Sequence, residues 1–322
     1  MTRVLVTGAA GFIGSHLVEA LTARGDEVVG LDNFDPFYPR AMKERNLAEV
    51  GKPRGFSFRE QDMLDVAALV PLLTPDTVVV HLAAKAGVRP SLANPVGYAQ
   101  ANVTGTAAVV EAARQAGVSR IVFGSSSSVY GDSTPVPFRE DATAVEPVSP
   151  YAATKRAGEL FLCSVAPIYG LRVASLRFFT VYGPRQRPDL AIHAFTRKMV
   201  EGRPLTLFGD GTQARDYTYC DDIIAGVVAS IGWTATAPVG VETFNLGGSR
   251  PVSTEAMVAE IAAALGIQPK IEWAPMQPGD VQRTAADLTK AGAVLGYAPK
   301  VPFAEGIRRF TRWFREAYGR AD

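Results

Sequence analysis

Arg3-Val-Leu-Val-Thr-Gly-Ala-Ala-Gly-Phe-Ile-Gly14 decides the fold of this 322-residue chain. Residues 3–7 form a short apolar run with a β-branched bias, typical of a buried strand, and residues 13–23 have the pattern of a following helix. Between them, Gly8, Gly11 and Gly14 permit a tight turn, and backbone N–H groups at a helix N-terminus can approach a diphosphate. The spacing is Gly-x-x-Gly-x-x-Gly rather than Gly-x-Gly-x-x-Gly. The stretch predicts a strand–turn–helix unit that holds a dinucleotide.

Strand and helix patterns alternate along the next 150 residues. We expect further strands at 27–31, 56–59, 77–82, 121–123 and 172–177, and helices at 65–72, 102–116 and 150–166. Such alternation implies a parallel, doubly wound sheet of Rossmann type, in the α/β class.

The pattern changes after residue 181. We expect strands at 204–208, 243–246 and 271–273, and helices at 192–201, 254–265 and 304–318. The prediction is a dinucleotide-binding domain at 1–180 and a smaller C-terminal α/β lobe for substrate at 181–322. Residues 217–246 are the segment that could return to the first domain.

The composition excludes several classes of protein. A hydrophobic content of 47% and a formal net charge of +1 argue against a nucleic-acid footprint, and no apolar run reaches membrane-spanning length. The N-terminus runs straight into a strand, without a signal peptide. Two cysteines, Cys163 and Cys220, fit a reducing compartment, and three histidines lack metal-ligand spacing. We therefore expect a cytoplasmic protein without a metal, a nucleic-acid partner or a membrane partner.

The end of the second predicted strand indicates which dinucleotide is bound. The Asp32 carboxylate can accept hydrogen bonds from ribose hydroxyls and would repel a 2′-phosphate. Asn33 rather than arginine follows it, so NAD is favoured over NADP, although Arg40 and Lys43 lie further along. Asp62 is a candidate acceptor for the adenine amino group or, alternatively, the N-cap of the helix at 65–72.

Tyr151 and Lys155 are the candidate chemical pair. Positions i and i+4 share one face of a helix, and a nearby ammonium lowers the pKa of a phenol. A phenolate can take the proton of a sugar hydroxyl while hydride leaves the same carbon. Together with the glycine turn, the pair predicts hydride transfer.

Several motifs resemble those of the extended short-chain dehydrogenases/reductases that act on nucleotide sugars. They are the glycine turn, Asp32-Asn, His81-Leu-Ala-Ala, Ser125-Ser-Ser-Ser-Val-Tyr-Gly, Ser149-Pro-Tyr-Ala-Ala-Thr-Lys and Leu176-Arg-Phe-Phe-Thr-Val-Tyr-Gly-Pro. Asp32-Asn-Phe-Asp-Pro-Phe-Tyr, Ala86-Gly-Val-Arg-Pro-Ser-Leu, Arg177-Phe-Phe-Thr-Val-Tyr-Gly-Pro-Arg-Gln-Arg-Pro-Asp and Gln277-Pro-Gly-Asp-Val are most similar to the UDP-glucuronate 4-epimerase branch.

The resemblance implies a mechanism and a cofactor site. Ser126 would complete a triad with Tyr151 and Lys155, unless it only forms a turn. C4 of the sugar would be oxidised by a retained NAD, the 4-keto sugar would rotate, and returning hydride would invert C4. The implied cofactor-binding residues are Gly8, Gly11, Phe12, Ile13, Gly14, Asp32, Asn33, Asp62, Met63, Leu82, Ala83, Ala84, Asn102, Tyr151 and Lys155.

The resemblance also separates neighbouring activities. Sugar 4,6-dehydratases carry an Asp-Glu pair after the triad hydroxyl, and UDP-glucuronate decarboxylases carry Glu before Val-Tyr, where this chain has Ser127 and Ser128. Both serines, with Thr180, could hold a sugar carboxylate away from decarboxylation. Arg89 and Arg185 are further candidates or, alternatively, solvated surface charges.

The remaining expectations concern the nucleotide and the assembly. By the same resemblance, Arg215 would bind the diphosphate, Gln277 and Asp280 would lie near the ribose or phosphates, and Ala191 and Phe195 would contact the uracil. A homodimer through the helices at 102–116 and 150–166 is implied. Competing functions are a UDP-glucose or UDP-N-acetylhexosamine 4-epimerase, a UDP-glucuronate decarboxylase and a non-catalytic NAD-binding protein.

Overall fold

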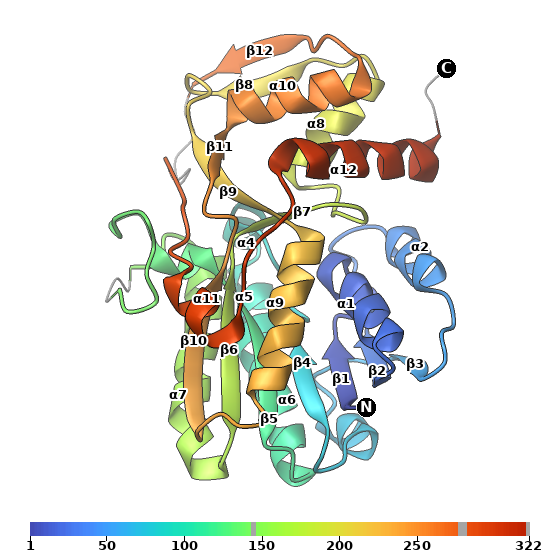
Figure 1. The fold of residues 1–322 in the computed structure, drawn as a ribbon, viewed down its shortest axis with the longest axis vertical. Helices are drawn as coiled ribbons and strands as arrows, with labels where there is room; N and C mark the ends of the chain where they lie inside the picture. The colour runs from blue at the N-terminus through green and yellow to red at the C-terminus, as the bar shows by residue number, and fades with distance from the viewer. Residues whose placement is uncertain (143–145, 276–281, 320–322) are drawn as a thin grey trace.

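A seven-stranded parallel sheet forms the centre of the computed structural model, which describes residues 1–142, 146–275 and 282–319 (Figure 1). The strand order is β10-β6-β5-β4-β1-β2-β3. The strands are β1 (Arg3–Thr7), β2 (Glu27–Asp32), β3 (Phe56–Glu60), β4 (Val78–His81), β5 (Arg120–Ser126), β6 (Arg172–Phe178) and β10 (Gly240–Leu246).

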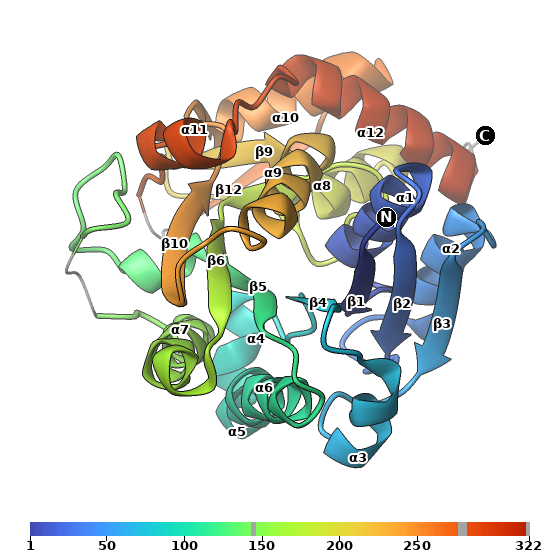
Figure 2. The same ribbon diagram turned by 60° about the horizontal axis from the view of Figure 1, so that its bottom comes forward.

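Helices cover both faces of this sheet, so its strands are buried on each side (Figure 2). Alternate residues of one strand enter different cores: Val4 and Val6 pack on the α1 and α9 side, and Leu5 packs on the α6 and α7 side. The helices of this layer are α1 (Phe12–Ala23), α2 (Arg40–Val50), α3 (Val66–Leu69), α4 (Val88–Ala93), α5 (Pro95–Ala99), α6 (Gly105–Gln115), α7 (Pro150–Tyr169), α9 (Cys220–Trp233) and α11 (Thr289–Leu295). Short turns are η1 (Val70–Leu72), η2 (Gln100–Thr104) and η3 (Ser127–Tyr130).

The second lobe lies beyond the carboxyl ends of the strands (Figure 1). A three-stranded sheet, in the order β11-β9-β7, and a two-stranded sheet, β12-β8, pack with three helices there. The elements are β7 (Thr180–Tyr182), α8 (Ala191–Val200), β8 (Leu205–Phe208), β9 (Ala214–Tyr219), β11 (Pro251–Ser253), α10 (Thr254–Leu265), β12 (Ile271–Ala274) and α12 (Phe303–Tyr318).

The chain does not divide cleanly at residue 181. The strand expected at 243–246 is β10, which pairs with β6 at the edge of the first sheet, and α9 packs on α1. One continuous core also runs from Val4 and Leu17 to Leu207 and Phe310 of the second lobe. The two lobes therefore share their packing.

Two differences from the sequence expectations have local causes. The helix expected at 102–116 begins as the π-turn η2 and becomes α6 only at Gly105. Helix α2 was not predicted because its sequence is largely polar, and it buries only Lys43, Asn46 and Val50.

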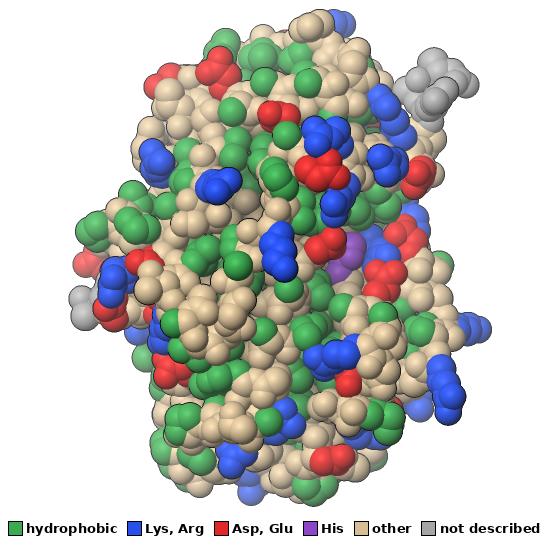
Figure 3. Space-filling model, viewed as in Figure 1, with side chains coloured by type: hydrophobic (Ala, Val, Ile, Leu, Met, Phe, Trp, Pro, Cys, Tyr) green, Lys and Arg blue, Asp and Glu red, His purple; other side chains and the backbone are tan. Residues whose placement is uncertain are grey.

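The surface shows no large patch of one charge on the face drawn in Figure 3, where basic and acidic side chains alternate. Among the described helices, none combines the length and the apolar character that crossing a membrane requires.

Candidate active site

A cavity opens at the carboxyl ends of the central strands, above the glycine turn. β1 stands between β4 and β2 in the sheet, the switch point at which open α/β sheets bind ligands. The predicted cofactor residues that line this cavity are Gly8, Gly11, Phe12, Ile13, Gly14, Asp32, Asn33, Met63, Leu82, Ala83, Ala84, Tyr151 and Lys155.

The glycine turn leaves no room for side chains. A Cβ on Gly8, which has a φ of 74°, would lie 2.9 Å from the backbone nitrogen of Ala83. A Cβ on Gly14 would lie 2.1 Å from the carbonyl oxygen of Gly8. Gly11 is the N-cap of α1 and offers no side chain that could accept hydrogen bonds from the first N–H groups of the helix. These N–H groups belong to residues that line the cavity. A bare turn and an uncapped helix N-terminus fit a dinucleotide diphosphate.

Buried His81 holds the start of the segment after β4, whose residues Leu82 and Ala83 line the cavity. Thr106 Oγ1 donates to the carbonyl of Asn102, so it accepts from Nε2 of His81 at 3.1 Å. Nδ1 of His81 therefore accepts from Thr7 Oγ1 at 2.8 Å, and Thr7 in turn accepts from the amides of Leu82 and Ala83. Burial lowers the pKa of His81 to about 3, which keeps the ring neutral and this network intact.

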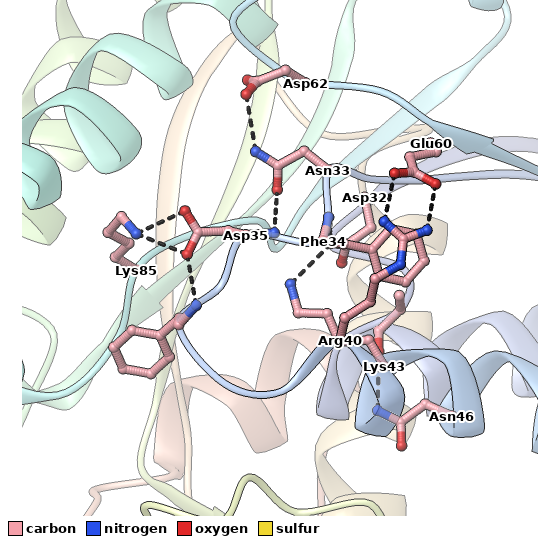
Figure 4. Close-up of polar contacts among 12 residues, drawn as sticks. Asp32, Asn33, Phe34, Asp35, Arg40, Lys43, Asn46, Glu60, Asp62 and Lys85 are labelled. Atoms are coloured by element: carbon pink, nitrogen blue, oxygen red, sulfur yellow. Dashed lines mark hydrogen bonds and ion pairs between the residues drawn. The ribbon is translucent and has the colours of Figure 1, made fainter.

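The cations near Asp32 are paired with carboxylates (Figure 4). Buried Lys43 donates to Asp32 Oδ1 at 3.0 Å, and Arg40 binds both oxygens of Glu60 at 2.8 and 2.7 Å. Asp32 also accepts from the amide of Phe34. Arg40 and Lys43, the two cations that could have favoured NADP, thus each have an acidic partner. The Asp32 carboxylate remains at the cavity wall.

Two predicted cofactor residues are placed just behind the cavity wall. Asp62 accepts from the amide of Leu64 and from Nδ2 of Asn33. The alternative N-cap role of Asp62 is wrong, because α3 begins at Val66 and Asp65 caps it. Buried Asn102 bonds the backbone N and O of Lys85 and so holds the loop after β4.

The end of β5 and the first turn of α7 bring the chemical groups together. Ser149 caps α7 and Pro150 opens it, which places Tyr151 in the first turn and Lys155 one turn later. Ser126 Oγ accepts from the amide and the hydroxyl of Ser128 at 3.2 and 2.9 Å. Both acceptor sites of Ser126 are then filled, which leaves its proton to be donated, and the interaction of Ser126 with Tyr151 opposes the rise in the pKa of that phenol.

The electrostatics of Tyr151 differ from the sequence expectation. Burial raises the pKa of Tyr151, and the interactions that oppose the rise come from Ser126 and Arg187. The predicted lowering by Lys155 is not among them; the Lys155 ammonium donates to the carbonyl of Gly124 at 2.7 Å. Burial also lowers the pKa of Lys155 to about 8.

A buried ion-pair network below the site was missed by sequence reasoning. Glu159, on the turn of α7 after Lys155, accepts from Ser125 Oγ at 2.7 Å. Arg177 of β6 donates twice to Glu159 at 2.9 Å, and Arg156 adds a second cationic partner. The network fixes α7 against the strand ends that carry Ser125 and Ser126. No local pattern marks it, because its members lie on three different elements.

The predicted substrate residues lie around this cavity rather than along its wall. Ser127 and Ser128 are in η3, Thr180 begins β7, and Arg215 is in β9. Ala191 and Phe195 are in α8, and Arg89 of α4 lies 5.3 Å from the ring of Phe208. Gln277 and Asp280 lie outside the described residues.

Two neighbouring arginines lie differently with respect to the cavity. Arg185, predicted for substrate, is buried between Glu19 and Glu49 at 2.7 and 2.8 Å and does not line the cavity, so we do not retain it as a substrate residue. Arg187, which the sequence prediction passed over, lines the cavity and pairs with Asp189. In Arg185-Gln-Arg187 the backbone conformation, with a φ of 62° at Arg185, decides which guanidinium faces the cavity.

One cluster of potential metal-ligating side chains is formed only by the tertiary structure. Packing of α1 on α9 brings His16, Cys220 and Asp221 within 4.8 Å of one another, although the sequence suggested no Cys/His cluster. His16 bonds the carbonyl of Pro184, Asp221 pairs with Arg309, and burial raises the pKa of the Cys220 thiol. We assign no metal to this cluster.

Comparison with known proteins agrees with this geometry. The family model described as "NAD dependent epimerase/dehydratase family" matches residues 4–247. The chain belongs to this family. It is 40% identical over 319 residues to a UDP-glucuronate 4-epimerase of Thermodesulfobacterium geofontis, covering 98% of this chain and 97% of that protein.

Solved structures of family members have the same fold over the whole chain. A UDP-glucuronic acid 4-epimerase of Bacillus cereus, in complex with UDP-glucuronic acid and NAD, has a TM-score of 0.91 at 36% identity, over 98% of this chain and 100% of that chain. A UDP-glucose 4-epimerase of Thermotoga maritima with UDP-glucose has a TM-score of 0.87 at 32% identity, over 98% and 99%. The predictions of a Rossmann-type fold, of an enzyme of this family and of NAD as its cofactor are confirmed.

Proposed function

We propose that this enzyme interconverts UDP-glucuronate and UDP-galacturonate by inverting C4. The observation that carries the proposal is the serine cluster at the end of β5. Ser126 is oriented toward Tyr151 by Ser128, and the positions that would hold an acid in dehydratases or decarboxylases are Ser127 and Ser128. The full-length similarity to UDP-glucuronate 4-epimerases supports the same substrate.

Tyr151 is proposed to hold and return the proton of the C4 hydroxyl. NAD supplies the hydride acceptor and donor when it is bound. The proton of Ser126 and the charge of Arg187 stabilise the phenolate of Tyr151 against the cost of burial. Lys155 holds the end of β5 through Gly124, which keeps Ser126 beside Tyr151.

The sugar carboxylate requires a second set of groups. A 4-keto uronic acid loses carbon dioxide when its carboxylate bond aligns with the carbonyl π-system. Hydroxyl donors from Ser127, Ser128 and Thr180, and the guanidinium of Arg187, are proposed to hold the carboxylate out of that alignment. Arg89 remains a candidate for the same task.

The UDP moiety is assigned to the second lobe. Arg215 is proposed to bind the diphosphate because a guanidinium can fork onto phosphate oxygens. Ala191 and Phe195 of α8 are proposed to contact the uracil, and Gln277 and Asp280 the ribose or phosphates.

The test is to incubate the purified protein with UDP-glucuronate, without added NAD, and to follow the sugar by NMR. UDP-galacturonate is the expected product. A pentose with carbon dioxide would contradict the role of Ser127 and Ser128. Turnover of UDP-glucose alone would favour the second candidate, a UDP-glucose 4-epimerase, which the Thermotoga maritima neighbour supports. No turnover of any UDP-sugar would favour a non-catalytic protein.

We further propose a cytoplasmic homodimer without a nucleic-acid partner. Leu160 and Ile168 on α7 are 54% and 75% exposed, and an apolar helix face is a common dimer contact. The homodimer would pair residues 102–116 and 150–166 of two subunits. Leu160→Glu should shift the mass in sedimentation to that of a monomer; an unchanged dimer would place the interface elsewhere.

A further inference from the structure

The loop between β2 and α2, residues 33–39, is tied to the loop after β4 by one ion pair. Lys85 Nζ donates to both oxygens of Asp35, at 2.8 and 2.7 Å (Figure 4). Both residues line the cavity. The contact joins segments that are 50 residues apart in the chain.

The strand order fixes where this contact runs. β1 lies between β4 and β2 in the sheet, and the glycine turn follows β1. A bond between a residue after β2 and a residue after β4 must therefore cross above that turn. The Asp35–Lys85 pair spans the crevice in which the diphosphate of a dinucleotide is expected.

The two ends of the pair are held differently. The backbone of Lys85 is fixed by buried Asn102, which also bonds Thr154 of α7, so this end is part of the rigid core. Asp35 follows Phe34, which has a φ of 51°, a conformation unfavourable for a bulky residue. The Asp35–Lys85 pair therefore links a loop with an unfavourable backbone conformation to the rigid core.

Asp35 also holds the residues of the loop that come after it. Asp35 Oδ1 accepts from the amide of Phe37, whose ring lies 5.2 Å from the guanidinium of Arg187. Phe37 and Tyr38 both line the cavity. Releasing Asp35 would free the part of the loop that forms this wall.

We propose that the Asp35–Lys85 pair is a clasp that holds the 33–39 loop over the bound dinucleotide and slows its release. The proposal rests on the proposed function, because a retained cofactor is required when hydride is removed and returned in one cycle. Asp35 and Lys85 are positioning residues in this view, and each acts on the cofactor through the loop.

The test measures loss of radiolabelled NAD from the loaded enzyme in excess unlabelled NAD. Asp35→Asn removes the charge and keeps an oxygen for the amide of Phe37. We expect it to release label about two- to fivefold faster than the wild type, the range for a partly exposed ion pair. Lys85→Met should match it, and the double variant should be no faster than either single variant.

The control is Glu111→Gln, which breaks the exposed pair with Arg114 on α6, away from the cavity, and should release label like the wild type. Faster release in Lys85→Met but not in Asp35→Asn would mean that Lys85 acts on the cofactor directly, and would overturn the clasp. A second readout is hydrogen exchange of the cofactor-free protein. Amides of residues 33–39 should exchange faster in Asp35→Asn, and unchanged exchange would also overturn the clasp.

The two proposals fail in different ways. If the wild type epimerises UDP-glucuronate while Asp35→Asn keeps wild-type release and exchange, only the clasp is wrong. If no UDP-sugar is turned over while the exchange result holds, the loop closure stands and the proposed function fails.

Discussion

Lys155 Nζ and the carbonyl oxygen of Gly124 are joined by a hydrogen bond of 2.7 Å. Gly124 lies in β5 two residues before Ser126, and Lys155 lies one turn after Tyr151 on α7. The ammonium thus connects the strand that carries Ser126 and the helix that carries Tyr151. Lys155 thereby holds these two residues near each other, while burial raises the pKa of Tyr151 and the interactions with Ser126 and Arg187 oppose the rise.

Burial of the Lys155 ammonium makes stability depend on pH. Its pKa falls from 10.5 to about 8 on folding, so between these values the unfolded chain binds more protons than the folded one. The free energy of unfolding of the wild type should therefore rise with pH across this window, by about 3 kcal/mol at most, relative to Lys155→Met. Urea unfolding of both proteins at pH 7.5 and pH 10.5, to within about 0.5 kcal/mol, checks this. A constant difference between the two proteins would mean that Lys155 is not buried as a cation.

Removing the phenol should separate binding from chemistry. Tyr151→Phe deletes the proton acceptor and leaves the glycine turn, Asp32 and the β4 loop unchanged. Bound NAD, measured after denaturation of the purified protein, should stay at the wild-type level, while kcat falls by about 10²–10⁴-fold or more. Ser126→Ala should show a smaller loss. Normal turnover by Tyr151→Phe would disprove the assignment of the proton transfer.

Neutralising Glu159 should lower the free energy of unfolding of the protein. Glu159→Gln leaves Arg177 buried without its carboxylate partner, and breaking a buried pair in this way costs about 3 kcal/mol or more. The urea midpoint should drop accordingly. The matched control, Glu111→Gln, breaks an exposed pair and should change stability by about 0.5 kcal/mol or less. Equal effects of the two changes would contradict the burial of this network.

Replacing glycine by alanine should damage the protein at Gly14 and stabilise it at Gly232. Gly14→Ala would place Cβ 2.1 Å from the carbonyl of Gly8, so the turn must distort and NAD binding should be lost. Gly232→Ala, near the end of α9, meets no atom within 4 Å and should stabilise the helix by about 0.5–1 kcal/mol. Calorimetry and NAD titration of both variants check the pair. Unimpaired NAD binding by Gly14→Ala would contradict the close contact in the turn.

Local patterns were enough to predict much of the site. The glycine turn, Asp32 and the Tyr151–Lys155 pair each depend on residues within one strand, turn or helix, and the structure places all of them at one cavity. Thr7 and His81 were harder, since a lone threonine and histidine in buried strands are typical of many cores. Their importance follows from the network that joins β1, β4 and α6.

The sequence by itself determined the alternating α/β pattern, the dinucleotide turn and the helix that carries Tyr151 and Lys155, because periodicity and turn chemistry act over a few neighbouring residues. Only the tertiary structure decided that β10 joins the first sheet, that Arg187 rather than Arg185 faces the cavity, and that Asp35 meets Lys85. Those outcomes depend on contacts between distant segments. The packing of the whole chain sets such contacts, and no short window of sequence contains them.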